Sequence, residues 1–290
     1  MKTIKDRVAV ITGGGSGIGK GIALALSGAG AKIVVADINE ASANEAAAEI
    51  AARGGKALAV KCDVVDPTAF ETLRDKTLAE FGQVDIIVNN AGVILSGMPE
   101  DIPVAEFARI VDILLMSVVR SNAVFLPMFL AKGEGHIVNT SSFAGLYTYA
   151  YDRLAYSAAK AAVFNLTEGL ALYLKPKGIG VTALCPGPVQ TNIMHSNKIW
   201  TENQTIMRGP GAEFRLMSAD EVGALVLNAI REGIFFLPTD PLVIPKLVKR
   251  AEDADAFLQD QLDHPHIIDL AAIQKAARER AAAQIDSQKQ

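Results

Sequence analysis

The stretch that decides the fold is Thr12-Gly13-Gly14-Gly15-Ser16-Gly17-Ile18-Gly19. The apolar run 7–12 leads directly into it, and an Ala-rich amphipathic stretch, 17–29, follows. Glycines between a strand and a helix permit a tight turn and let the backbone approach a pyrophosphate. The helix then offers free N–H groups and the positive end of its dipole to the phosphates. The pattern predicts a dinucleotide phosphate site at Gly13, Ser16, Gly17, Ile18 and Gly19.

An acidic residue, Asp37, lies eighteen residues after Gly19, at the end of an apolar run. A carboxylate here can accept hydrogen bonds from the adenosine ribose hydroxyls and would repel a 2′-phosphate. Neither Ile38 nor Asn39 supplies a cation, and the glycine loop has no Lys or Arg. We therefore predict NAD rather than NADP. The alternative is that Asp37 only caps the helix that begins at Glu40.

Short β-branched runs alternate with longer Ala-rich stretches along the chain, which is typical of a parallel α/β sheet. The runs are apolar throughout, as expected when helices cover both faces. We predict a Rossmann-type, doubly wound, parallel seven-stranded sheet with helices on both faces. The expected strands are 7–12, 32–37, 57–62, 84–88, 135–140, 179–185 and 233–237. The expected helices are 17–29, 40–53, 67–81, 103–131, 155–174 and 218–232.

The composition changes after Pro245. We expect one domain over residues 1–245, followed by a helical C-terminal extension of one or two helices over 246–290. Two alternatives remain for the extension: a solvated or lightly docked tail, or an arm that packs against another subunit.

Composition excludes several classes of function. Half of the 290 residues are hydrophobic and the net charge is −4, which gives no reason to expect binding to nucleic acid or to an anionic membrane. Cys62 and Cys185 lie far apart without metal-binding spacing, so we predict buried thiols and no metal. We find no signal peptide and no apolar run of the ~18 residues that a membrane span needs. The expected location is the cytoplasm.

A second motif, Tyr156-Ser157-Ala158-Ala159-Lys160, lies at the start of a predicted helix. Tyr156 and Lys160 are four residues apart, so a helix places them on one face. A phenol near an ammonium group should have a lowered pKa, which would suit it to proton transfer. The alternative is a packed aromatic side chain with a solvated neighbour.

These motifs and three others, in this order, resemble the short-chain dehydrogenase/reductase family over about residues 1–240. The matching segments are the glycine loop 12–19, Asp63-Val64, Asn89-Asn90-Ala91-Gly92, Ser142 with Tyr156 and Lys160, and Pro186-Gly187-Pro188-Val189-Gln190-Thr191.

The resemblance implies a role for each matching residue on the cofactor side. Asp63 and Val64 would contact the adenine ring, and Asn90 would stabilise the sheet and line the cofactor cleft. Val189 and Thr191 would anchor the carboxamide of the nicotinamide.

On the substrate side, the resemblance implies that Tyr156 is the general acid or base, with Lys160 holding the nicotinamide ribose. Ser142 would hydrogen-bond the substrate oxygen, with Ser141 as its competitor. The family usually has an Asn in the helix after the fourth strand, but this chain has Leu114 there. Ser117 or the helix backbone could hold the relay water instead.

The family's substrate-covering lid would correspond to about 192–217. This segment is apolar, with Trp200, its arginines are Arg208 and Arg215, and no carboxylate or phosphate clamp is evident. We expect an NAD-dependent oxidoreductase that interconverts a lipophilic or aryl-substituted secondary alcohol and its ketone. The alternative is a catalytically silent nucleotide-binding protein of the same fold. The resemblance also implies a homotetramer or homodimer formed through the helices 103–131 and 155–174.

Overall fold

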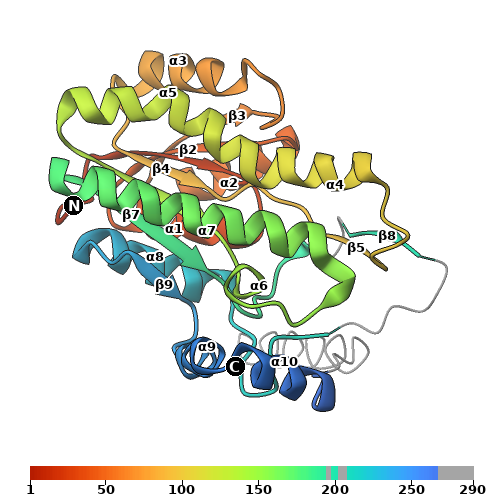
Figure 1. Ribbon diagram of the computed structural model, residues 1–290. Helices are drawn as coiled ribbons and strands as arrows, with labels where there is room; N and C mark the ends of the chain where they lie inside the picture. The colour runs from red at the N-terminus through yellow and green to blue at the C-terminus, as the bar shows by residue number, and fades with distance from the viewer. Residues whose placement is uncertain (194–196, 202–207, 267–290) are drawn as a thin grey trace, which may run out of the picture.

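Seven parallel strands form the centre of the molecule in the computed structural model, which describes residues 1–193, 197–201 and 208–266 (Figure 1). Their order across the sheet is β3-β2-β1-β4-β6-β7-β9, so the winding direction reverses between the neighbours β1 and β4. Ligands of such sheets bind at this reversal, outside the carboxyl ends of the strands. The strands are β1 (Val8–Thr12), β2 (Lys32–Asp37), β3 (Lys56–Lys61), β4 (Ile86–Asn89), β6 (Gly135–Thr140), β7 (Ile179–Cys185) and β9 (Phe236–Pro238).

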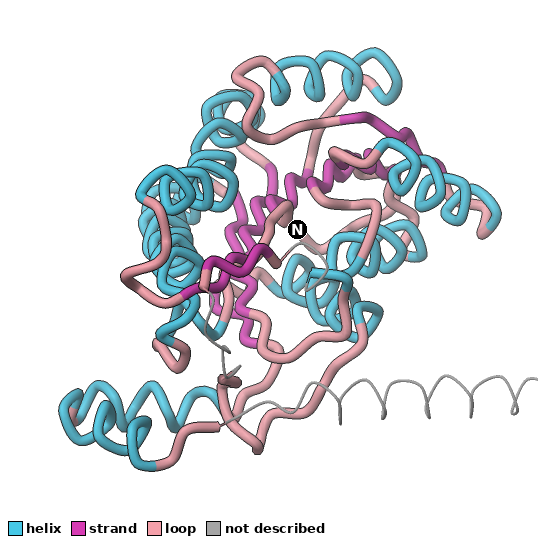
Figure 2. The backbone as a smooth tube through the Cα atoms, turned by 90° about the vertical axis from the view of Figure 1, so that its right-hand side faces the viewer, coloured by secondary structure: helices cyan, strands magenta, loops and turns pink. Residues whose placement is uncertain are grey.

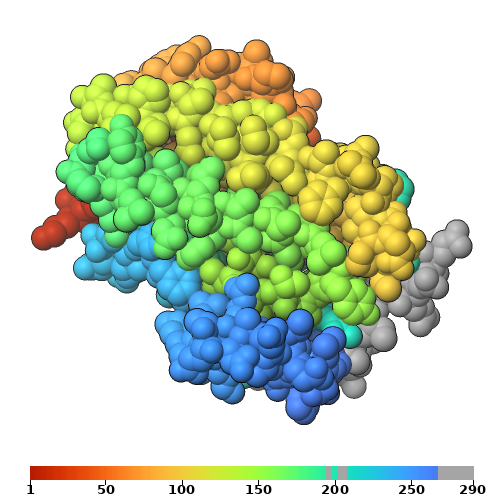
Figure 3. Space-filling model, in the orientation of Figure 1, coloured from red at the N-terminus to blue at the C-terminus, as the bar shows by residue number. Residues whose placement is uncertain are grey.

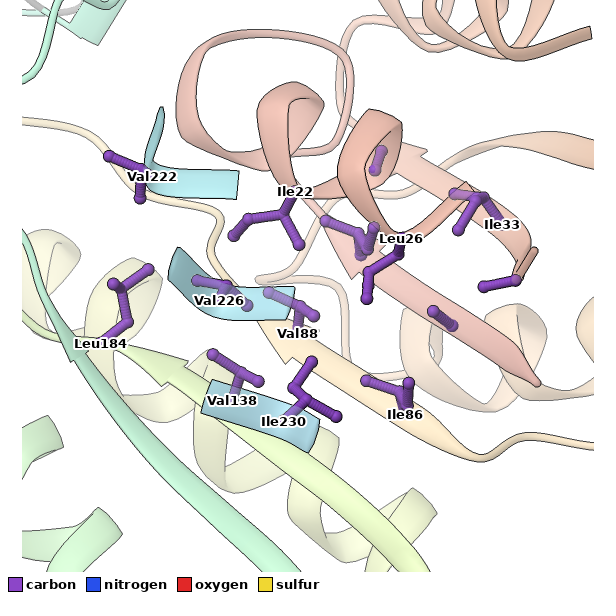
Figure 4. Close-up of a cluster of buried hydrophobic side chains, with 14 of the residues drawn as sticks. Ile22, Leu26, Ile33, Ile86, Val88, Val138, Leu184, Val222, Val226 and Ile230 are labelled. Atoms are coloured by element: carbon purple, nitrogen blue, oxygen red, sulfur yellow. The ribbon is translucent and has the colours of Figure 1, made fainter. Parts of the chain in front are cut away.

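Helices cover both faces of the sheet, because alternate residues of each buried strand point to opposite sides. Ala9 and Ile11 pack with α1 (Gly17–Gly28), α2 (Glu40–Ala52) and α8 (Ala219–Glu232). Val8 and Val10 pack with α3 (Ala69–Phe81), α5 (Ser117–Lys132) and α7 (Leu154–Leu174) on the other face. Figure 4 shows the first of these cores, where α1 and α8 meet the sheet. The predicted fold class is confirmed.

Two glycines set the spacing of α1 and α8. A Cβ atom on Gly21 would lie 2.2 Å from the Ala219 carbonyl oxygen, and one on Gly223 would lie 2.2 Å from the Gly21 carbonyl oxygen. Larger residues would force the helices apart, so these glycines fix where α8 lies beside the glycine loop.

The predicted helix 103–131 is divided into three parts: α4 (Val104–Val111), a π-helical turn η1 (Asp112–Met116) and α5. Together, Val104–Lys132 is long and apolar enough to cross a membrane by length and composition, which corrects the expectation that the chain has no such stretch. In this fold its side chains Phe125 and Phe129 are buried in the core between helix and sheet, as in the core helices of globular proteins.

Several short elements were not predicted. They are the strands β5 (Leu95–Gly97) and β8 (Lys198–Trp200), which pair in a small parallel sheet, the helix α6 (Phe143–Leu146), and the 3₁₀ turns η2 (Tyr151–Arg153) and η3 (Lys175–Lys177). Each has only three or four residues, too few for a hydrophobic period to be recognisable.

The C-terminal extension begins with two helices, α9 (Val243–Glu252) and α10 (Ala254–Asp263). In Figures 1 and 3 they form a lobe at the lower edge of the molecule, while in Figure 2 the remaining helices flank the strands on both sides. The first helix starts before the expected boundary at 245, with Pro245 in its first turn, where proline is tolerated. The rest of the extension, 267–290, lies outside the described residues.

A buried histidine, His136, lies in the middle of the sheet on β6. Thr182 uses its hydroxyl proton to bond the Ile234 carbonyl, so the His136 Nε2–H donates to the Thr182 oxygen, 2.9 Å away. Nδ1 has no partner among the described residues and faces Gly180. Burial, together with the positive N-terminus and Lys175, lowers the pKa of His136 to about 3.

We predict that His136 makes the protein less stable in acid. Its folded pKa lies below its ordinary value of 6.5, so the stability that it contributes is complete above pH 6.5 and decreases as the pH falls toward 3. Between pH 6.5 and 4.5, His136→Asn should make the pH dependence of the unfolding free energy shallower by up to about 1.4 kcal/mol per pH unit. Urea unfolding at several pH values measures this, with His264→Asn on exposed α10 as the control. An unchanged slope in His136→Asn would contradict the assignment.

Candidate active site

The glycine loop makes the tight turn between β1 and α1 that the sequence predicts. Gly13 has a φ of 62°, and a Cβ atom there would lie 2.9 Å from the Cα atom of Ala91. A Cβ atom on Gly19 would lie 2.1 Å from the Gly13 carbonyl oxygen. The helix N-cap, Ser16, makes no side-chain cap hydrogen bond, so the first N–H groups of α1 remain available to a phosphate. Gly17 and Ile18 begin this helix.

Asp37 lies at the carboxyl end of β2, beside the glycine loop. Its carboxylate accepts hydrogen bonds from the Gly15 N–H, at 3.0 Å, and from the Asn39 N–H, at 2.9 Å. The helix cap is Asn39, whose side chain accepts a hydrogen bond from the Ser42 N–H, so the alternative in which Asp37 caps this helix is wrong. The backbone bonds leave Asp37 oriented toward the loop, with lone pairs free for ribose hydroxyls.

Asn90 joins the ends of three strands. Its Nδ2 donates to the carbonyl oxygens of Thr12, at 3.2 Å, and of Gly13, at 3.3 Å. Its Oδ1 accepts from the Thr140 hydroxyl at 3.5 Å. These bonds agree with the sheet-stabilising role that we expected of Asn90.

The predicted adenine contacts lie after β3. Asp63 is exposed and accepts a hydrogen bond from the Val65 N–H, at 3.2 Å, and Val64 is buried. Both are at the same edge of the sheet as Asp37.

Ser142, Tyr156 and Lys160 are brought together by β6, α6 and α7. Ser142 caps α6 by accepting a hydrogen bond from the Ala144 N–H, at 3.1 Å, and is in hydrogen-bonding contact with the Tyr156 phenol. The competitor Ser141 instead donates to the Lys160 carbonyl oxygen, at 2.7 Å, which is a structural role. Lys160 is buried, its Nζ donates to the Thr140 carbonyl oxygen at 2.6 Å, and it lies 5.8 Å from the centre of the Tyr156 ring.

The prediction that Lys160 lowers the pKa of Tyr156 is wrong in this structure. Burial raises the Tyr156 pKa, against smaller lowering effects of the Ser142 hydrogen bond and the positive charge of Arg153. Burial also lowers the pKa of Lys160, to about 8. Removing both groups from water penalises their charged forms, and Lys160 is directed toward Thr140 rather than toward the phenol.

A family model described as short chain dehydrogenase matches residues 7–202. The chain belongs to this family. Family membership confirms the prediction of a nicotinamide cofactor. The motifs that carry the resemblance lie at the carboxyl ends of the strands, where the fold exposes them on one edge.

Curated relatives and solved structures of the family are similar to much of the chain. The probable oxidoreductase EphD of Mycobacterium tuberculosis is 42% identical over 190 residues, which are 65% of this chain and 32% of the relative, so the match spans about a third of that protein. Cyclohexanol dehydrogenase of an Acinetobacter species is 37% identical over 240 residues, 82% of this chain and 93% of the relative.

Among solved structures, a short chain dehydrogenase/reductase from Burkholderia phymatum in complex with NAD has a TM-score of 0.78 and 31% identity. The match covers 88% of this chain and 96% of that one.

Leu114 occupies the position where short-chain dehydrogenases usually have an asparagine. It lies in the π-helical turn η1, is buried, and packs with Leu95 and Ala159. A Cβ atom on Gly92 would lie 3.0 Å from Leu114 Cδ2 and 3.9 Å from Lys160 Nζ, so Leu114 borders the lysine without being able to hydrogen-bond it. The suggested substitute, Ser117, donates to the Ile113 carbonyl oxygen at 2.6 Å and is thus engaged in its own helix.

Val189 and Thr191 lie between the glycine loop and the lid. Val189 pairs with Met217 in an isolated parallel bridge, so the two ends of the lid segment are joined at its base. The side chain of Thr191 would be 3.2 Å from a Cβ atom on Gly17. A cavity of about 310 Å³ opens beside Thr191 and Gly17. Within the lid, 194–196 and 202–207 lie outside the described residues.

The C-terminal helices contact the segment that precedes Tyr156. Phe257 of α10 packs edge-on against Tyr147, with ring centres 5.9 Å apart, and Arg250 of α9 donates to the Leu146 carbonyl oxygen at 2.6 Å. Tyr147 in turn donates to the Pro210 carbonyl oxygen of the lid, at 2.8 Å. The described helices of the extension, α9 and α10, therefore pack against the loop before α7, which in turn bonds the lid.

Sequence reasoning missed Arg153. This residue is 8% exposed, although it is charged, and its guanidinium donates to the Arg208 carbonyl oxygen. Its spacing of three residues before Tyr156 was the available signal, because this spacing places two residues on neighbouring parts of a helix face.

We predict that Asp37→Ala combined with Ile38→Arg shifts the cofactor preference toward NADP. The double variant removes the carboxylate that would repel a 2′-phosphate and adds a cation at a side chain that is 61% exposed. The ratio of kcat/KM for NADP to that for NAD should rise at least about tenfold, since one charge-assisted bond supplies that much.

Steady-state kinetics with both cofactors measures the ratio. Ile38→Arg alone is the control, because it retains Asp37 and should keep the preference for NAD. An unchanged ratio in the double variant would rule out Asp37 as the selectivity residue.

Proposed function

We propose that the protein is an NAD-dependent dehydrogenase that interconverts a lipophilic secondary alcohol and its ketone. The observation that carries this proposal is the meeting of Ser142, Tyr156 and Lys160 at the carboxyl ends of the strands, next to a glycine loop built for a dinucleotide. Tyr156 is half-buried with its hydroxyl in contact with Ser142, so one substrate oxygen could reach both groups.

A bound nicotinamide would supply hydride transfer to and from the carbinol carbon. In the oxidation direction, Tyr156 takes the proton from the alcohol oxygen as the hydride leaves. In reduction, Tyr156 gives that proton to the oxygen of the forming alkoxide. Ser142 donates a hydrogen bond to the same oxygen and stabilises its developing negative charge.

Two positive side chains assist Tyr156 and the cofactor in different ways. Lys160, held by the Thr140 carbonyl, would bind the nicotinamide ribose hydroxyls. Arg153 lowers the pKa of the phenol through its charge, which partly offsets the effect of burial. The phenolate is thereby favoured when the alcohol must give up its proton.

The preference for NAD rests on Asp37. Its carboxylate is oriented by two backbone N–H groups beside the glycine loop, with Ile38 exposed in place of a cation. The Burkholderia neighbour, which was solved with NAD, supports the same choice.

The proposed substrate class follows from the apolar side chains beside Tyr156. The apolar residues Leu95, Ile110 and Leu114 form a cluster against which Tyr156 and Trp200 pack. An apolar wall next to the reacting hydroxyl favours a ring or an aliphatic chain over a polyol. The similarity to cyclohexanol dehydrogenase supports a cyclic or otherwise lipophilic alcohol.

The alternative, a catalytically silent binding protein, would not need the three side chains to be kept together. Their burial costs free energy because charged and polar groups leave water. A protein that only binds a nucleotide gains nothing from that cost, so catalysis is the better account.

Association into a dimer or tetramer is also part of the proposal. The outward faces of α4, α5 and α7 carry exposed apolar side chains, among them Val104, Val119 and Leu172. Such faces are typical of subunit contacts, and light scattering on the purified protein would test this. A cytoplasmic location is consistent with Cys62 and Cys185, which are both free and buried.

The direct test is to mix the purified protein with NAD and a panel of secondary alcohols, including cyclohexanol and 1-phenylethanol, and follow absorbance of the reduced cofactor. We expect reduction with at least one lipophilic alcohol, at a rate that rises between pH 7 and pH 10. The sign follows from the raised Tyr156 pKa, because the fraction of phenolate increases with pH. Measurable NAD binding without reduction by any alcohol would favour the silent binding protein.

A further inference from the structure

Buried polar atoms without partners gather around the start of α7, the small sheet of β5 and β8, and the lid. Within the described part of the chain, ten buried side-chain nitrogen or oxygen atoms have no hydrogen-bond partner. Six of them belong to β5, η2, the first turn of α7 and the lid: Ser96 Oγ, Asp152 Oδ2, Ser157 Oγ, Asn197 Oδ1, Trp200 Nε1 and Arg208 Nε. Native proteins leave few buried polar groups unpaired, so this concentration points to a place where a ligand or water completes the bonds.

Arg153 lies at the centre of this region and is only partly satisfied. Its Nε is 3.4 Å from Asp152 Oδ1, and one Nη donates to the Arg208 carbonyl oxygen. The guanidinium has five N–H donors, and no other hydrogen bond to it is formed within the described residues. Its face lies 5.7 Å from the Tyr149 ring, which leaves its edge as the part that can receive a ligand.

The fold places Arg153 in line with the reacting groups. Arg153 is the N-cap of α7, and Tyr156 and Lys160 follow it by three and seven residues, a spacing that continues along one helix face. The turn η2 packs against β5, and β5 pairs with β8 of the lid, which carries Trp200. Arg153 therefore lies at the junction between the lid and the start of α7, one helical turn before Tyr156.

The charged groups around Arg153 do not sum to zero. Arg153 and Arg208 are both cations, and Arg208 lies over the Tyr151 ring at 4.6 Å. Asp152 is the one acidic side chain paired with either of them in the described residues, because Glu213 nearby is paired with Lys246 at 2.9 Å. Arg153 is buried and Arg208 is only partly exposed, so this net positive charge favours an anion beside it.

We propose that Arg153 and Arg208 form an anion subsite at the junction between the lid and the start of α7. This subsite binds a carboxylate at the end of the substrate remote from its carbinol. This inference rests on the proposed dehydrogenase function and narrows its substrate to lipophilic hydroxy acids and keto acids. It differs from the expectation of no carboxylate clamp, because Arg153 lies outside the 192–217 segment. The Trp200 N–H and the Ser96 hydroxyl are the neutral donors of the same subsite.

The experiment compares three alcohols of one shape: 4-(1-hydroxyethyl)benzoate, its methyl ester and 1-phenylethanol, each with NAD. The wild type should oxidise the carboxylate with a kcat/KM about tenfold to a hundredfold above that for the ester, mainly through a lower KM, as expected for charge-assisted hydrogen bonds. Arg153→Gln should abolish this preference, whereas the loss of kcat that follows from removing its charge beside Tyr156 should be the same for all three alcohols. Arg153→Lys should keep part of the preference.

The matched control is Arg215→Gln. Arg215 lies in the 192–217 segment, as Arg208 does, but it is exposed and paired with Glu221 at 2.8 Å. Removing it should leave the preference for the carboxylate intact. If wild type oxidises the ester and the carboxylate equally well, or if Arg153→Gln lowers kcat/KM for all three alcohols to the same degree, Arg153 serves only to fasten the lid and the proposal is overturned.

Binding separates this inference from the proposed function. Titration calorimetry of the NADH-loaded protein with 4-acetylbenzoate and with its methyl ester reports the subsite without turnover. Tighter binding of the carboxylate supports the subsite even if no alcohol is oxidised, whereas equal binding of the two contradicts it.

Discussion

The working edge of this protein depends on the hydrogen bonds of Asn90. Its side-chain amide holds the carbonyl oxygens of Thr12 and Gly13, and its oxygen accepts from the Thr140 hydroxyl. The carbonyl of Thr140 in turn receives the Lys160 ammonium group. One continuous chain of bonds thus runs from the glycine loop to Lys160, across β1, β4 and β6. Because β1 and β4 are neighbours only where the winding reverses, the fold and the site share this constraint.

Burial explains the electrostatics around the site. It raises the Tyr156 pKa and lowers that of Lys160, so forming the charged state of either side chain costs free energy in the ligand-free protein. The hydrogen bond from Ser142 and the charge of Arg153 favour the phenolate instead. Leu114 and its apolar neighbours pack against one side of Tyr156 and keep water away from it. The electrostatic interactions of the Tyr156 phenol are stronger as a result. The cost is that no side-chain relay through an asparagine is present at Leu114.

Most of the fold was predictable because its signals are local. A buried parallel strand such as 179–185 is apolar along its length, and a glycine loop between strand and helix has few other uses. The site residues on these elements followed from the order of the motifs. The direction of the Tyr156 pKa shift was not predictable, since spacing on a helix says nothing about desolvation. Arg153 was missed for a related reason: its importance comes from the fold bringing β5 and the lid over the start of α7.

The most direct measurement of the central claim is the turnover of Tyr156→Phe with NAD and an alcohol that the wild type oxidises. The account predicts that NAD binding stays within about twofold, since the cofactor is held mainly by the loop and Asp37, while turnover falls at least about a hundredfold. Tyr151→Phe, which alters an exposed tyrosine five residues earlier, should retain most of the activity. Near-normal turnover in Tyr156→Phe would contradict the account, because a group other than Tyr156 would then have to take the proton of the alcohol.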